Sequence, residues 1–328
     1  MPSKSKIKSI ISQILKASVA VGLLLYLGLT GKMDVVKIAH ALVASPWMLL
    51  AIGLEFLAMW MIGIRWHLLL YSQGVRLSLL KTMKFVFIGH FFNVVIPGTV
   101  SGDVVKAYYV IRGHSNKMVA GLSVFMDRFI GLIVLLLVTC LAVGFNGAFV
   151  QSIPELTILA MITWMGFIFL IVFGIVFILK KDMKLPLYFP AFFRNLTEAF
   201  WSYRNDFKSL WKASLLTLIN FFINLLVYYS AMKALEIELL PFTQYLFIIP
   251  IGMFAMALPL APAGLGIGQG VFLKLFEWAY HKPLTAGADM ISLVQIAYIS
   301  WALVGCIVYL LHKEDVSLKE MEREVLST

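Results

Sequence analysis

The stretch FVFIGHFFNVVIPGTVSGDVVK, residues 85–106, decides the fold, because an apolar run stops at a Pro-Gly break and resumes with polar residues. The same pattern returns in FTQYLFIIPIGMFAMALPLAPAGLGIGQGVFLKLFE, residues 242–277. Proline lacks a backbone N–H and fixes φ, so it ends the first run before that run is long enough to cross a membrane. Broken apolar segments at corresponding places in two halves of a chain are typical of transporter substrate sites.

The composition places this protein in a membrane. Hydrophobic residues make up 61% of its 328 residues and charged residues 13%, whereas soluble domains carry about a quarter charged residues. The length leaves no room beside the apolar runs for a soluble catalytic domain of roughly 100 to 150 residues, so we expect one membrane domain. The net charge of +10 is spread over loops beside these runs, which favours membrane topology over nucleic-acid binding.

Six stretches have the roughly 20 apolar residues that a membrane-spanning helix needs. They are Ile10–Leu29, Pro46–Leu70, Met118–Val143, Leu156–Leu179, Trp211–Met232 and Asp289–Leu311. The two broken segments fit re-entrant hairpins between these spans. The sequence therefore predicts an all-α polytopic membrane protein with six full transmembrane helices and two re-entrant helical hairpins.

Lys and Arg are concentrated in alternate loops, which predicts cytoplasmic N- and C-termini in a cell membrane. Residues 1–150 and 151–328 then each contain two spans, a hairpin and a third span, with opposite topology, as in an inverted repeat. Residues 185–210 mix aromatic with basic side chains and suit an amphipathic helix at the cytoplasmic interface. That helix is either a plain connector or a docking site for a partner.

The first hairpin carries four candidate site residues, which are Asn93, Ser101, Asp103 and Lys106. Ser101 can cap the returning helix, and the free N–H groups and partial positive charge of that helix start suit an anionic group. The Asp103 carboxylate can contact the substrate, bind a coupling ion or neutralise Lys106. The sequence leaves these three roles open.

Five further candidates come from the second hairpin and from the spans. Gly266 and Gln269 begin the second returning arm, where bare backbone can approach an anion. Arg65, Asp127 and Arg128 are charged residues within apolar spans, and such residues are functional hypotheses by default. Arg65 can instead extend to water near the span end, and a structural salt bridge between helices is the alternative for Asp127 and Arg128.

These residues fall in an ordered set that resembles the flippase-like membrane region of lysylphosphatidylglycerol synthases. The set comprises Arg65-Trp66, Leu69–Gly74, Phe92–Lys106, Ser123–Leu132 with Asp127-Arg128, and Pro259–Gln269. Where the family usually has Glu and Arg in the first hairpin, this chain has Asp103 and Lys106. Where the family usually has an acidic residue at the end of the last motif, it has Gln269, so ion coupling through that position does not carry over.

The resemblance implies movement of an amphiphile without the domain that synthesises it. We expect a translocase that moves an anionic or polyprenyl-linked lipid between leaflets. The alternatives are an accessory subunit that binds a lipid-modifying enzyme or glycosyltransferase, and a secondary transporter of a small anion. We recognise no nucleophile–base pair, metal cluster or nucleotide loop in the sequence, so we expect neither enzymatic activity nor a cofactor. The sequence leaves the oligomeric state, including a homo-oligomer, open.

Overall fold

A computed structural model describes residues 18, 21–96, 101–113, 117–179, 201, 203, 206–257 and 262–311. Half of the predicted first span, Ile10–Leu29, lies outside the described residues, and residues 21–29 are helical. Most of the predicted interfacial helix at 185–210 lies outside them as well, and so do the loop residues 97–100 and 258–261 at the two breaks.

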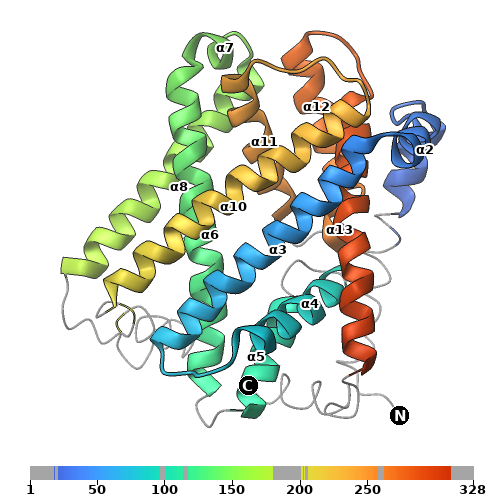
Figure 1. Cartoon of the computed structure of the whole chain (residues 1–328). Helices are drawn as coiled ribbons and strands as arrows, with labels where there is room; N and C mark the ends of the chain where they lie inside the picture. Colours follow the sequence, from blue (N-terminus) through green and yellow to red (C-terminus); the bar gives the residue numbers. More distant parts are fainter. Residues whose placement is uncertain are drawn as a thin grey trace, which may run out of the picture. The chain divides into compact units, whose positions relative to one another are not determined.

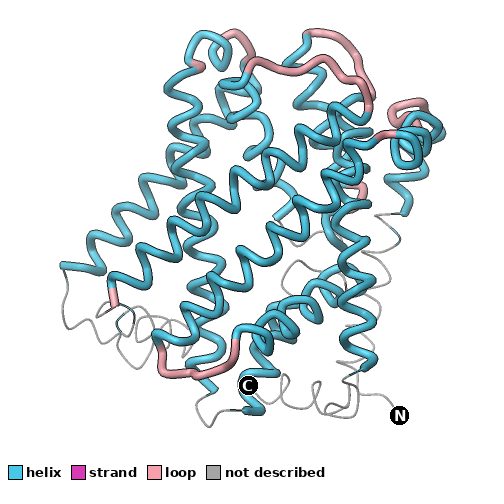
Figure 2. Tube along the Cα trace, viewed as in Figure 1, coloured by secondary structure: helices cyan, strands magenta, loops and turns pink. Residues whose placement is uncertain are grey.

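Every regular element in the described part of the chain is a helix (Figure 2). The helices labelled in Figure 1 are α2 Val35–Ala44, α3 Pro46–Ser72, α4 Leu79–Val95, α5 Ser101–Gly113, α6 Lys117–Phe145, α7 Gly147–Gln151, α8 Pro154–Leu179, α10 Phe207–Ala234, α11 Phe242–Ala257, α12 Ile267–Tyr280 and α13 Ala286–Leu311. A short 3₁₀ helix, Pro262–Gly264, precedes α12.

Five of the described helices are long and apolar enough to cross a membrane. Their candidate spans are Pro46–Ser72, Gly121–Phe145, Pro154–Val172, Phe207–Ala234 and Ala286–Leu311. Helix α8 exposes large apolar side chains along its length, among them Met165 and Phe169, as expected for a helix that faces lipid. These five spans confirm a multi-pass helical membrane protein.

The helices on the N-terminal side of the two breaks are shorter than the spans. Helix α4 has 17 residues and α11 has 16, which at 1.5 Å per residue gives about 25 Å, less than a hydrocarbon core of about 30 Å. Their re-entrant placement and the inverted repeat of residues 1–150 and 151–328 stay predictions.

The chain divides into two compact units that interleave along the sequence. The first unit contains residues 1–59, 86–105 and 223–328, and the second contains residues 60–85 and 106–222. The first unit therefore includes the described residues on both sides of both helix breaks.

In the first unit, α13 is packed closely by glycine contacts on two sides. A Cβ built on Gly287 would lie 2.0 Å from the carbonyl oxygen of Phe272 on α12. A Cβ built on Gly305 would lie 2.1 Å from the carbonyl oxygen of Phe87 on α4. Only glycine allows such close backbone approach, so α13 contacts an arm of each broken segment.

The second unit is built on α6 and its neighbours. Helix α6 packs against α8, and a buried apolar cluster joins Leu69 of α3, Met126 and Ile130 of α6, and Ala213 of α10. Tyr203 completes this cluster, and its hydroxyl donates to the carbonyl oxygen of Leu69 at 3.0 Å. This unit holds Arg65, Asp127 and Arg128, the three charged candidate residues that the sequence places within spans.

Candidate functional site

A buried ion pair joins two spans of the second unit. The Nε of Arg65 on α3 donates to Oδ1 of Asp127 on α6 at 2.6 Å. The residues are only 7% and 2% exposed. Arg65 therefore does not extend to water, and the guanidinium instead has a carboxylate partner, which is the arrangement that makes a buried charge tolerable.

The guanidinium of Arg65 also contacts a third helix. Its Nη1 donates to Oγ1 of Thr217 on α10 at 2.9 Å, and the Thr217 hydroxyl donates to the carbonyl oxygen of Ala213. A guanidinium has five N–H groups. Two N–H groups of Arg65 donate hydrogen bonds, one to Asp127 and one to Thr217, and the other three N–H groups have no partner among the described residues. These three can donate to a further oxygen.

Trp66 connects this ion pair to Lys106. The Nε1 of Trp66 donates to Oγ of Ser123 on α6 at 3.2 Å. The Nζ of Lys106 on α5 lies 5.1 Å from the centroid of the Trp66 ring, within the range of a cation–π contact. Lys106 is buried. The second unit thus brings together three predicted site residues, which are Arg65, Lys106 and Asp127.

Arg128 is placed differently from its neighbour Asp127. Its side chain is exposed, whereas that of Asp127 is buried. Consecutive residues of a helix point in different directions, so the direction that buries one exposes the other. A role for Arg128 in the site stays a prediction.

The first break is held by polar side chains of both arms. The Oδ1 of Asn93 on α4 accepts a hydrogen bond from the backbone N–H of Gly102 on α5 at 2.8 Å. The hydroxyl of Ser101 donates to the carbonyl oxygen of Phe92 at 3.0 Å. Asn93 thus satisfies one of the free N–H groups at the start of α5, and a capping role of Ser101 stays a prediction.

Gly102 lets the two arms of this segment touch. A Cβ built on it would lie 1.9 Å from the carbonyl oxygen of Gly89. Asp103 follows directly and is 2% exposed. It lies in the first turn of α5, where the partial positive charge of the helix favours a carboxylate.

The second break carries an amide network at the start of α12. The Oε1 of Gln269 accepts from the backbone N–H of Gly266 at 2.8 Å. Its Nε2 donates to Oγ of Ser292 at 3.1 Å and to Oε1 of Gln295 at 2.6 Å, both on α13. Gln295 in turn donates to the carbonyl oxygen of Ala263 at 3.3 Å. Gln269 therefore ties the break to α13 and satisfies the N-cap N–H.

Helix α13 also holds the first broken segment by polar contacts. Nε2 of His90 on α4 lies 2.9 Å from the carbonyl oxygen of Tyr298, and the rings of Phe91 and Phe92 pack on Tyr309. One helix of the first unit thus supports residues beside both breaks. The five predicted residues of this unit, Asn93, Ser101, Asp103, Gly266 and Gln269, lie at the two breaks that α13 supports.

Three partners were missed in the sequence, namely Thr217, Ser292 and Gln295. Each is a polar residue within an otherwise apolar helix, and that isolation is the signal that could have found them. Hydroxyl groups are common in membrane helices, because they can bond to their own backbone, as Thr217 and Ser292 do. Composition alone therefore does not separate such residues from those that bridge helices.

The helices and their buried polar contacts define a multi-pass membrane protein with polar groups at two helix breaks and within its spans. The family model for the lysylphosphatidylglycerol synthase TM region matches residues 13–305. The chain therefore belongs to this family, which confirms the resemblance seen in its sequence. A comparison with curated proteins finds no match.

Proposed function

We propose that this protein is a lipid translocase, which moves an anionic or polyprenyl-linked lipid between the leaflets of the cell membrane. Family membership relates the chain to lipid handling. The observation that carries the proposal is the pair of interrupted helices whose buried polar residues are supported by the same helix, α13. Irregular backbone at membrane depth is tolerated where it is buried in protein or lines a polar path.

Arg65 is the best candidate to contact an anionic headgroup. It is buried in a candidate span, and three of its N–H groups have no partner among the described residues. A phosphate oxygen is a suitable acceptor for a guanidinium. In this proposal, Asp127 and Thr217 hold the guanidinium in place and Lys106 adds a second buried cation.

The proposed mechanism is alternating opening of the two halves, residues 1–150 and 151–328, around the hairpins. Each hairpin would enter from a different face, with both termini in the cytoplasm. Such a protein acts on its substrate without covalent chemistry, so the proposal includes no enzymatic step.

A vesicle assay tests this proposal. Purified protein is reconstituted with trace phospholipids or polyprenyl phosphates that carry a fluorescent headgroup, and a membrane-impermeant quencher is then added. We expect quenching beyond the outer-leaflet fraction for at least one anionic lipid class. The double variant Arg65→Gln/Asp127→Asn, which removes the guanidinium without leaving the Asp127 carboxylate unpaired, should slow this phase, whereas Arg76→Gln, a change of an exposed arginine, should not.

Two results would contradict the proposal. Quenching equal to that of empty vesicles for every lipid would exclude translocation. Saturable uptake of a soluble anion without any movement of lipid would instead identify a secondary transporter.

A further inference from the structure

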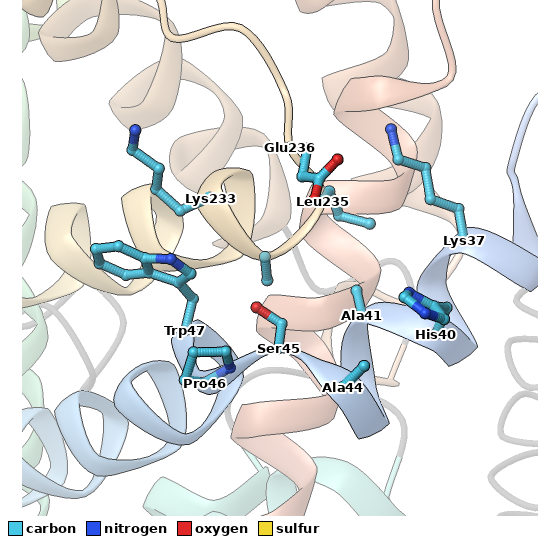
Figure 3. Close-up of a pocket in the computed structure, with 11 residues that line it drawn as sticks. Lys37, His40, Ala41, Ala44, Ser45, Pro46, Trp47, Lys233, Leu235 and Glu236 are labelled. Carbon is cyan, nitrogen blue, oxygen red and sulfur yellow. The ribbon is translucent and has the colours of Figure 1, made fainter.

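A cavity of about 500 Å³ lies in the first unit, and no residue at either helix break lines it. One side is lined by α2, the turn after it and the start of α3, and the other side is lined by residues 233–236 at the end of α10 (Figure 3). The residues of the first side are Lys37, His40, Ala41, Ala44, Ser45, Pro46 and Trp47. Ligand pockets commonly have volumes of about 300 to 1,000 Å³. The cavity is therefore large enough for a complete headgroup.

The lining carries charges of both signs. Lys37 and Lys233 contribute two ammonium groups, Glu236 contributes one carboxylate, and His40 adds an imidazole. In Figure 3, the carboxylate of Glu236 lies between the two lysine side chains. Neither lysine forms a salt bridge with a described residue. The Nζ of Lys233 lies 5.8 Å from the centroid of the Tyr229 ring, so an anion can still approach it.

The cavity lies where two candidate spans end. Helix α3 begins there at Pro46, and α10 ends there at Ala234. Trp47 is at this level, where aromatic residues of membrane proteins are enriched. Helix α2 exposes Val36 at 80% and Val43 at 88%, which suits a helix that lies against lipid. The cavity therefore opens at the level of the lipid headgroups. At this level a lipid headgroup is a more suitable ligand than a soluble anion.

Glu236 occupies a position that normally belongs to glycine. Its φ is +53°, and the turn that it makes closes α10 with hydrogen bonds from Glu236 N to Lys233 O and from Ile237 N to Met232 O. This pattern is a Schellman motif. The same position after α3 is occupied by Gly74, with φ +80°. A side chain held in a left-handed conformation points to a role for that side chain.

We propose that this cavity binds the headgroup of a zwitterionic, amine-bearing phospholipid, with the phosphate against Lys37 and Lys233 and the amine against Glu236. Two cations beside one carboxylate match these opposite charges. The site is separate from the helix breaks and does not depend on translocation. In the predicted topology it opens toward the external leaflet.

Native mass spectrometry of the detergent-solubilised full chain tests the proposal by titration with phosphatidylethanolamine, phosphatidylglycerol and diacylglycerol. Phosphatidylethanolamine should bind most tightly and diacylglycerol least tightly. Because each lysine would lose its ion pair with the phosphate, the double variant Lys37→Gln/Lys233→Gln should bind roughly tenfold more weakly. Glu236→Gln should abolish the preference for phosphatidylethanolamine over phosphatidylglycerol.

Lys282→Gln is the matched control. Lys282 does not line the cavity, it is exposed as Lys37 is, and its Nζ lies 6.0 Å from the Tyr280 ring centroid, much as that of Lys233 lies near Tyr229. The affinity of Lys282→Gln for phosphatidylethanolamine should equal that of the wild type. Equal affinity of the double lysine variant, or equal binding of diacylglycerol, would overturn the proposal. A preference for phosphatidylglycerol would refute the role of Glu236. Displacement of the lipid by an equimolar amount of inorganic phosphate would identify a soluble-anion site instead. Unchanged thermal unfolding of each variant shows that it is folded.

Discussion

Replacement of Asp127 by Asn should strongly destabilise the second unit. The substitution keeps the shape of the side chain but removes the negative charge that lies 2.6 Å from Nε of Arg65. A guanidinium stays charged in proteins, and Arg65 is buried, so the variant leaves a cation without its counter-charge. Removal of one partner from a buried pair costs about 3 to 5 kcal/mol, whereas a polar contact between membrane helices contributes about 0.6 to 2 kcal/mol. We therefore expect a loss of about 3 kcal/mol for Asp127→Asn.

The double variant Arg65→Gln/Asp127→Asn separates charge from packing. It removes both charges and keeps two amides at the same positions, so it should lose less stability than Asp127→Asn alone, by about 1 to 2 kcal/mol. Unfolding in mixed micelles with increasing dodecyl sulfate measures the free energies. Glu155→Gln, at an exposed carboxylate on α8, is the control and should stay within about 0.5 kcal/mol of the wild type. Equal stabilities of Asp127→Asn and the wild type would refute the reasoning.

Three further substitutions test the helix ends and breaks by the same unfolding measurement. Gly102→Ala should cost about 1 to 3 kcal/mol, because its Cβ would clash with the Gly89 carbonyl. The control Gly121→Ala, in open space, should be neutral or stabilising by up to about 1 kcal/mol. A larger loss of stability for Gly121→Ala than for Gly102→Ala would exclude a close contact of α4 and α5. Gln269→Leu should cost about 2 kcal/mol, because it leaves buried polar partners unsatisfied, and a neutral result would mean that the amide network does not stabilise the break. Glu236→Gly should gain about 1 kcal/mol of stability, because glycine adopts the left-handed conformation at this position without strain. The same variant should bind phosphatidylethanolamine more weakly. A loss of stability would show that the turn is not strained.

The sequence predicted the positions of the helices better than the contacts between their side chains. Long apolar runs identify five of the spans, because helix length and membrane thickness are directly related. Proline and glycine locate both breaks for a similar local reason. The boundaries are less certain, since α10 begins at Phe207, whereas the predicted span begins at Trp211. The first residues of α10 were assigned to the interfacial segment at 185–210 because they include basic side chains.

Helix α2 was not predicted, although its start carries a local signal. The side chain of Asp34 accepts a hydrogen bond from the backbone N–H of Lys37 at 2.9 Å, as an N-cap does. The helix has only 10 residues, and Lys37 and His40 interrupt its apolar pattern. A search for membrane-spanning lengths therefore passes over it, and with it over the cavity that it lines.

Pairing across the chain was the least predictable feature. Arg65 and Asp127 were each recognised as charges at membrane depth, but 62 residues separate them, and nothing local selects one as the partner of the other. The support of both broken segments by α13 depends on Gly287 and Gly305. Glycines are common in membrane helices, so only the packing shows which of them allow close contact.

The sidedness of the residues that flank the two broken segments tests the central claim, that each segment is a re-entrant hairpin, most directly. Cys140 and Cys306 are the only cysteines, and their replacement by Ala gives a background for single cysteines at four exposed positions, Lys81, Arg112, Glu238 and Lys282. A membrane-impermeant maleimide is applied to intact cells and to inverted vesicles. We predict that Lys81→Cys and Arg112→Cys both react from the cytoplasmic face, and that Glu238→Cys and Lys282→Cys both react from the external face. Reaction of either pair from opposite faces would show that its broken segment crosses the membrane completely, and reaction of all four from one face would exclude hairpins of opposite entry.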